Sequence, residues 1–217
     1  MTIEPIVFVV DDDPAARDSV AALVKSKGVQ VRVFASAEEF LAALDPALFG
    51  CVVADVRMTG MSGLELQTAL NQRKVRLPVI IITGFGDIPT AVRAMKAGAS
   101  TFLAKPCRAE ELWTSIRKAL HDAADLHEAE DRAGQARSRL AALTPEERQV
   151  MRLMLAGKTN RMIAMELDFG LRTIELRRAN IMRKMEADTF ADLVRLILIS
   201  GDQERPTDAT SETTSSS

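Results

Sequence analysis

Residues 52–66 read VVADVRMTGMSGLEL: an apolar run that ends in an acidic residue, a loop with two glycines, and the start of a helical pattern. Short apolar runs rich in β-branched residues recur along the first half of the chain, at 3–10, 29–34, 51–54, 79–82 and 101–104. Helical patterns lie between them, at 15–27, 37–44, 63–74 and 88–97, and another begins near Arg108. Strands that alternate with helices of this length form βαβ units and a parallel sheet covered on both faces. Five strands and five helices predict a flavodoxin-like, doubly wound α/β domain.

The remainder of the chain is helical in pattern. The segment from Arg108 to Leu140 contains no proline, and its polar, alanine-rich end predicts that the fifth helix continues into a helical linker. His121 and His127 lie in that linker, where we expect solvated side chains. Thr144 and Pro145 then start an all-helical domain of four short helices. Its expected core has helical spacing and comprises Val150, Leu153, Met154, Met162, Ile163, Met165, Leu167, Ile174, Leu176, Ile181, Met185, Leu193 and Ile197.

These patterns divide the chain into four parts. We expect the α/β domain at 1–120, the linker at 121–140, the helical domain at 141–200 and a disordered tail at 201–217. The tail is rich in Thr, Ser, Asp and Glu and has no periodicity.

Composition places the chain among ordinary globular proteins. Of 217 residues, 47% are hydrophobic, and the formal net charge is −2. No apolar run is long enough to span a bilayer, and the N-terminal stretch MTIEPIVFVV is typical of a first strand rather than of a signal peptide. Cys51 and Cys107 lack the spacing of metal ligands. We therefore expect a cytoplasmic protein without membrane contact, and a redox role for either thiol stays open.

Polar side chains follow four of the predicted strands. Asp11 and Asp12 come after the first strand, Asp55 ends the third, Thr83 ends the fourth, and Lys105 follows the fifth. The carboxyl ends of parallel strands share one edge of a sheet, where ligands bind. Three carboxylates cluster there only with a counter-cation, and hard oxygens suit Mg²⁺.

This arrangement permits phosphoryl transfer to a carboxylate. Asp55 is the candidate nucleophile, which would form an acyl phosphate. The candidate Mg²⁺ ligands are Asp11, Asp12, Asp55 and the backbone carbonyl of Arg57. Lys105 and Thr83 would contact phosphoryl oxygens. Each residue alone has a structural reading, since the acids before Pro14 also suit a helix N-cap and Asp55 suits a turn, but their joint placement favours the functional one.

Four stretches carry a family resemblance: VVDDDP (9–14), VVADVRMTGMSGLEL (52–66), IIITGFGDIPTAVRAMKAGA (80–99) and FLAKP (102–106). They strongly resemble the receiver domain of response regulators. The resemblance implies that a sensor histidine kinase phosphorylates Asp55, that Asp11 and Asp12 bind Mg²⁺, and that Thr83 and Lys105 sense the phosphoryl group.

The same resemblance makes Lys105-Pro106 a candidate cis peptide and Phe102 an aromatic switch residue. Thr59 is a departure, because the family usually has proline there, and we expect it to loosen the loop after Asp55.

Residues 143–196 resemble the LuxR/NarL-type helix-turn-helix, and residues 4–200 resemble the FixJ subfamily of response regulators. The resemblance implies a scaffold helix at 160–167, a turn at 168–170 and a recognition helix at 171–185. That helix carries five basic side chains against one acidic, Glu175. Glu175 could accept a hydrogen bond from cytosine and Arg178 could bond guanine. The candidate DNA contacts are Lys158, Asn160, Arg172, Thr173, Glu175, Arg177, Arg178 and Lys184.

The predicted function is a phosphorylation switch that controls binding to promoter DNA. The face of the fourth helix and fifth strand would form a homodimer on phosphorylation, and its candidate contacts are Ala91, Val92, Met95 and Lys96. The family implies a transcriptional activator, with RNA polymerase as a further partner.

Two alternatives remain. The C-terminal helices could bind a protein instead of DNA. The pocket could also be a phosphatase or dehalogenase site, but the chain has Arg57 where those enzymes place a second acid, and it has no cap domain. We therefore expect no enzymatic activity beyond its own phosphoryl transfer and slow autodephosphorylation.

Overall fold

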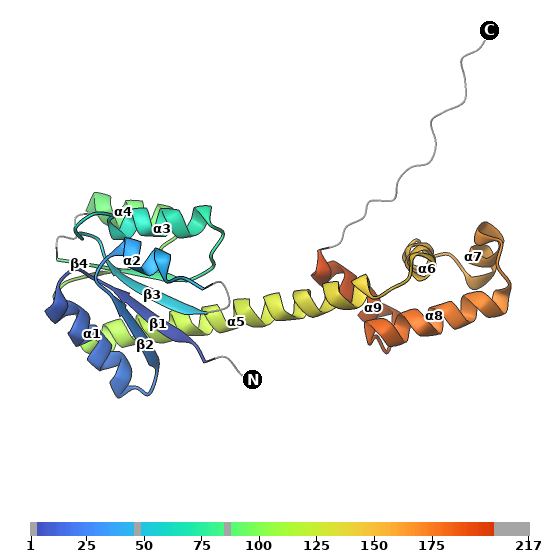
Figure 1. Cartoon of the computed structure of the whole chain (residues 1–217), viewed down its shortest axis with the longest axis horizontal. Coiled ribbons are helices and arrows are strands. Elements are labelled where there is room, and N and C mark those ends of the chain that lie inside the picture. Colours follow the sequence, from blue (N-terminus) through green and yellow to red (C-terminus); the bar gives the residue numbers. More distant parts are fainter. Residues whose placement is uncertain (1–3, 46–48, 85–87, 202–217) are drawn as a thin grey trace, which may run out of the picture. The chain divides into compact units, whose positions relative to one another are not determined.

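The computed structural model describes residues 4–45, 49–84 and 88–201. The chain divides into two compact units, Met1–Glu128 and Ala129–Ser217, which are described separately below (Figure 1). The predicted tail, apart from Gly201, lies outside the described residues. Within the described ranges, no helix combines the length and the apolar character that a membrane span requires.

The first unit contains a five-stranded parallel sheet. Its strands follow the order β2-β1-β3-β4-β5, which confirms the doubly wound fold. The central strands are buried along their whole length because helices cover both faces of the sheet. The strands are β1 (Ile6–Val10), β2 (Gln30–Phe34), β3 (Gly50–Asp55), β4 (Val79–Thr83) and β5 (Thr101–Ala104).

Two layers of helices enclose that sheet. Figure 1 shows α1 and α5 on one face and α2, α3 and α4 on the other. The α2 side has an aromatic cluster of Phe8, Phe34 and Phe40, and the α1 side buries Val24 and Ile116 in one hydrophobic cluster. The helices are α1 (Pro14–Ser26), α2 (Ala37–Ala42), α3 (Gly63–Gln72), α4 (Ile88–Lys96) and α5 (Ala109–Ala141).

Gly63 brings the start of α3 against the end of β3. A Cβ at this position would lie 2.3 Å from the backbone oxygen of Asp55. The Gly63 amide also donates to the carbonyl of Val56 at 3.2 Å. Glycine is therefore required here, because it lets the loop after Asp55 turn back sharply onto the strand.

Helix α5 runs without interruption for 33 residues, so the predicted linker is helical. His127 lies on it and stacks on Phe49, with ring centroids 4.3 Å apart. The expectation of a solvated His127 was wrong, because Phe49, which directly precedes β3, supplies an aromatic surface for the imidazole.

The second unit confirms the four predicted helices after the linker: α6 (Pro145–Leu155), α7 (Asn160–Leu167), α8 (Leu171–Met185) and α9 (Phe190–Ser200). Thr144, Thr159 and Thr189 cap α6, α7 and α9 through their hydroxyls. Three residues assigned to the core are instead exposed, namely Met162 at 51%, Met165 at 84% and Leu176 at 63%. Helical spacing alone cannot say which apolar residues of a short helix face its neighbours.

Candidate functional site

One ammonium group joins two acidic side chains at the carboxyl edge of the sheet. The Nζ atom of Lys105 lies 2.8 Å from Asp11 Oδ2 and 2.8 Å from Asp55 Oδ1. Only 6% of Asp11 and 8% of Asp55 is exposed. Burial alone would lower the pKa of Lys105, but its hydrogen bonds and charge attraction to the two carboxylates raise it. Lys105 is therefore a charged bridge across the sheet edge at neutral pH.

Backbone amides fix the remaining oxygens of these two carboxylates. Asp55 Oδ2 accepts from the Arg57 amide at 2.6 Å, and Asp11 Oδ1 accepts from the Asp13 amide at 3.0 Å. The Arg17 guanidinium donates to the Asp11 carbonyl at 2.6 Å. Asp55 consequently presents its carboxylate in a fixed direction at the end of β3.

Asp12 makes different contacts from Asp11 and Asp55. Its Oδ2 accepts from both the amide and the hydroxyl of Thr59, each at 2.8 Å. The Thr59 amide is the main cause that lowers the pKa of Asp12, and the Thr59 hydroxyl is the next. The expectation that Thr59 loosens its loop was wrong, since this residue ties the loop after β3 to the loop after β1.

The donors predicted for Mg²⁺ are of the right chemical kind. Carboxylate and carbonyl oxygens are the ligands that Mg²⁺ takes. Asp11 and Asp55 meet at Lys105, and Arg57 follows Asp55 by two residues. Across the described residues, however, no three acidic, histidine or cysteine side chains are grouped so as to hold a metal ion. The donor set fits the ion, but Asp12 is not grouped with Asp11 and Asp55.

The remaining residues of the predicted switch lie on the adjoining strands. Thr83 is buried at the end of β4, and its carbonyl accepts from the Lys105 amide at 2.7 Å. The peptide bond between Lys105 and Pro106 is cis. Phe102 on β5 is partly buried and packs against the α2 side of the core. Thr83 and Phe102 therefore lie on two neighbouring strands, and Lys105 directly follows the second of them, at one side of Asp55.

Helix α4 presents apolar side chains to solvent. Val92 is 45% exposed and Met95 51% exposed, and with Ala91 and Lys96 they line a shallow groove. Ile88, at 80% exposed, extends the same helix but was not predicted from the sequence. Ile88 lies about 200° around the helix from Thr90, so it faces away from the sheet while Thr90 and Ala94 are buried.

The exposed face of α8 differs from the predicted one. At 100° per residue, one stripe contains Arg172, Leu176, Ala179 and Arg183, with Glu175 at its edge. All five are exposed. Arg178 is half-buried instead, because it follows the buried Ile174 by one turn and precedes the buried Ile181 by three residues. The sequence interpretation placed Arg178 beside Glu175, and it missed Leu176 and Arg183.

Three predicted DNA contacts have partners inside the second unit. Lys184 donates to Glu147 Oε2 at 2.6 Å and to the Ala142 carbonyl at 3.3 Å. Lys158 pairs with Glu166. The Arg177 guanidinium stacks over the Phe169 ring at 4.2 Å. These side chains stabilise the helical packing, whereas Arg172 and Thr173 are exposed and Asn160 is half-buried at the start of α7.

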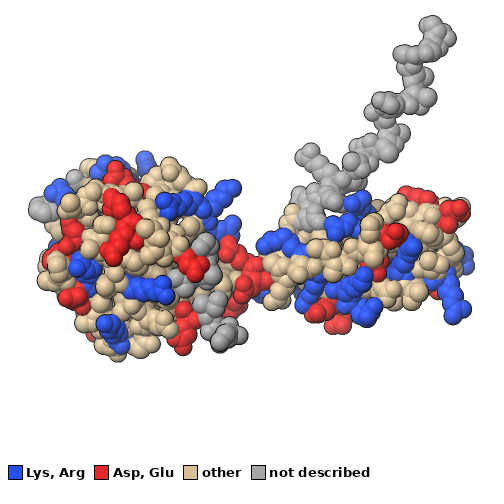
Figure 2. Space-filling model, viewed as in Figure 1, with Lys and Arg blue, Asp and Glu red and all other residues tan. Residues whose placement is uncertain are grey.

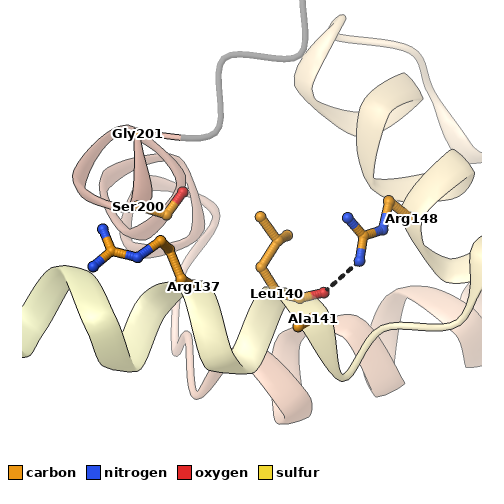
Figure 3. Close-up of a pocket in the computed structure, with 6 residues that line it drawn as sticks. All are labelled: Arg137, Leu140, Ala141, Arg148, Ser200 and Gly201. Atoms are coloured by element: carbon orange, nitrogen blue, oxygen red, sulfur yellow. Dashed lines mark hydrogen bonds between the residues drawn. The ribbon is translucent and has the colours of Figure 1, made fainter.

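The second unit still carries basic side chains at its surface. Figure 2 shows several Lys and Arg side chains over the part of this unit that α8 crosses. A separate hollow of about 380 Å³ lies between the end of α5, α6 and α9 (Figure 3). Arg148 crosses its rim and donates to the Leu140 carbonyl at 3.1 Å, which ties α6 to α5. The other residues around it are Arg137, Ala141, Ser200 and Gly201.

The two cysteines differ in environment. Burial raises the pKa of Cys51 to about 12, so its thiol is unreactive at neutral pH. Cys107 is partly exposed.

Comparisons with known proteins match both units. The model of the response regulator receiver domain matches residues 7–117, and that of the bacterial regulatory proteins of the luxR family matches residues 141–197. The chain therefore belongs to the response regulators that join a receiver domain to a LuxR-family DNA-binding domain.

Individual relatives narrow this class. The chain is 44% identical to the transcriptional regulatory protein FixJ of Bradyrhizobium diazoefficiens over 201 residues. This alignment covers 93% of this chain and 98% of FixJ. It is 40% identical to the response regulator protein TodT of Pseudomonas putida over 191 residues. This alignment covers 88% of this chain and 84% of TodT. The structure of the response regulator StyR superimposes with a TM-score of 0.83 at 40% identity, over 90% of this chain and 98% of StyR. Within the response regulators, the chain is thus of the FixJ type.

Proposed function

We propose that Asp55 is the phosphoacceptor of a two-component switch that regulates transcription. The observation that carries this proposal is the bridge from Lys105 Nζ to Asp11 and Asp55, at 2.8 Å from each. This contact supports a pocket in which a cation already offsets two buried acids. The phosphodonor would be a sensor histidine kinase.

The proposed reaction is a displacement at phosphorus. An oxygen of Asp55 attacks the phosphoryl group, a P–O bond forms, the P–N bond to the kinase histidine breaks, and the nitrogen keeps the electron pair. Lys105 then pairs with a phosphoryl oxygen, and the Thr83 hydroxyl donates to another. Asp11, Asp12, Asp55 and the Arg57 carbonyl would hold Mg²⁺, which offsets phosphoryl charge when bound.

Phosphorylation would be read out through β4, β5 and α4. Thr83 and Phe102 lie on these neighbouring strands, so a shift of Thr83 toward the phosphoryl group would alter how Phe102 packs. The exposed groove of Ala91, Val92, Met95 and Lys96 on α4 would then form a homodimer contact. Its apolar Val92 and Met95 give that contact a surface to bury.

The second unit would bind promoter DNA through α8. The exposed stripe of this helix suits a major groove, where Arg172 and Arg183 would contact phosphates and Glu175 a base edge. Leu176 lies in the middle of the stripe, and the only major-groove group of unmodified DNA that offers it apolar contact is the thymine methyl. DNA-bound dimers would activate transcription together with RNA polymerase in the cytoplasm.

A protein partner for the second unit is the alternative function, and one observation favours it. Met162 and Met165 leave an apolar patch on α7, and methionines suit adaptable protein contacts. Binding to duplex DNA that weakens steeply with salt would argue for the DNA function, because phosphate contacts release counterions.

The test compares wild type with Asp55→Asn, each with Mg²⁺ and either acetyl phosphate or beryllofluoride. We expect only the wild type to dimerise and to gain affinity for promoter DNA, measured by light scattering and fluorescence anisotropy. Equal behaviour of the two proteins would show that Asp55 is not the control point.

A further inference from the structure

The contact between Thr59 and Asp12 joins two loops that are far apart in the sequence. Both donors of Thr59 converge on one oxygen, Asp12 Oδ2, at 2.8 Å. Both residues are exposed, so burial does not force them together. The two hydrogen bonds themselves hold the Asp12 side chain.

These bonds involve Asp12, the one predicted acidic magnesium ligand that is not part of the bridge through Lys105. Asp11 and Asp55 share Lys105, and the described residues contain no three-membered acidic group able to hold a metal ion. Thr59 occupies Asp12 Oδ2 with both of its donors, so an ion that takes this oxygen must displace at least one of the two hydrogen bonds. Each bond has a charged acceptor and is stronger than a neutral one.

We propose that Thr59 competes with Mg²⁺ for Asp12 and so sets the Mg²⁺ concentration at which the phosphorylation pocket is filled. This inference rests on the proposed Mg²⁺ site. Thr59 is a positioning residue, since it acts only through Asp12. Proline, which is usual in the family at this position, has neither an amide N–H nor a hydroxyl and cannot compete.

A graded series of substitutions tests the proposal on the full chain without a phosphodonor. Thr59→Ser keeps both donors, Thr59→Ala keeps the amide alone, and Thr59→Pro keeps neither. We expect Mg²⁺ affinity equal to wild type for serine, about threefold to fivefold higher for alanine and about tenfold or more higher for proline. Affinity is measured by titrating MgCl₂ and following amide shifts by NMR, with the rise in melting temperature as a second readout.

Thr68→Ala is the matched control. The Thr68 hydroxyl is exposed on α3 and, within the part of the chain that the structure describes, donates only to the Leu64 carbonyl, at 2.9 Å, so its removal should leave Mg²⁺ affinity unchanged. Thermal unfolding without Mg²⁺ shows whether each variant is folded, and Thr59→Ala carries the test if the proline variant is not.

The outcomes separate this inference from the proposed site. If wild type binds Mg²⁺, Asp12→Asn weakens binding, and the alanine and proline variants bind it no better than wild type, the competition is refuted and the site stands. Weaker binding by those variants would mean that Thr59 orients Asp12 for the ion. If wild type does not respond to Mg²⁺, or Asp12→Asn changes nothing, the site fails and the inference fails with it.

Discussion

Lys184 and Glu147 form an ion pair across the second unit, with Lys184 Nζ 2.6 Å from Glu147 Oε2. The pair joins the end of α8 to the first turn of α6. Glu147 also accepts from the Thr144 amide at 2.9 Å, so one buried carboxylate fastens both the helix cap and the neighbouring helix. Lys184 therefore has a structural role in the second unit, and the DNA contact expected from its place at the end of a basic helix stays a prediction.

Lys184→Gln should destabilise the second unit by about 1–3 kcal/mol, because it leaves a buried carboxylate without its cation. Its neighbour Arg183 is exposed and, among the described residues, its side chain donates only to Asn180, at 3.2 Å, so Arg183→Gln should weaken DNA binding with little loss of stability. Urea unfolding and DNA binding at several salt concentrations separate the two effects. The reverse pattern would return Lys184 to the DNA interface.

The stability of the second unit should also depend on pH through Glu147. Burial alone would raise the pKa of this carboxyl from 4.5, but Lys184, the Thr144 amide and Arg177 lower it. A lowered pKa means that the pair stabilises the fold above the unfolded value and that this contribution disappears as the pH falls through the folded value. Wild type should lose its advantage over Glu147→Gln in acid, as measured by urea unfolding from pH 7 downward. An advantage that stays constant with pH would contradict the ion pair.

Gly63→Ala should disrupt the loop that carries Thr59 and follows Asp55. The added Cβ would lie 2.3 Å from the Asp55 oxygen, so α3 must move away from β3. We expect a loss of about 2 kcal/mol or more together with slower phosphorylation of Asp55 by acetyl phosphate. Gly134→Ala is the control, because Gly134 lies within α5 and its added Cβ would meet only the end of the Arg137 side chain at 4.0 Å. That change should be neutral or stabilising.

Leu176→Ala should make DNA binding insensitive to the methyl groups of thymine. Binding sites selected from random DNA can be remade with deoxyuridine in place of thymidine, which removes the methyl and keeps the base-pair hydrogen bonds. Wild type should lose about 1 kcal/mol of binding free energy at a contacted thymine, whereas the variant should lose almost none. Leu198→Ala, on the exposed side of α9, serves as the matched control. An equal methyl effect in wild type and Leu176→Ala would place Leu176 outside the groove.

Local pattern was enough to predict the sheet and most of the phosphorylation pocket. Asp55, Thr83 and Lys105 were located because each ends or follows a strand, and parallel strands bring those ends together. The boundaries of α7 and α8 also coincide with those that the resemblance to the LuxR/NarL-type helix-turn-helix implied.

The contacts that the sequence did not predict have a common physical cause, because they join distant parts of the chain. Thr59 meets Asp12 across 47 residues and Lys184 meets Glu147 across 37, and neither pair has a local signature. Arg178 and Leu176 were exchanged in role because the buried side of α8 is decided by Ile174 and Ile181, not by the position of its charges.

The division of α8 into an exposed stripe and a packed side has an evolutionary consequence. Ile174, Ile181 and Met185 are fully buried, so substitutions there are tested first by the stability of the fold. Arg172, Glu175, Leu176 and Ala179 contribute nothing to that core. Under the proposed DNA function, paralogues of such a chain can therefore diverge in operator preference by substitutions along this stripe while they keep the same domain fold.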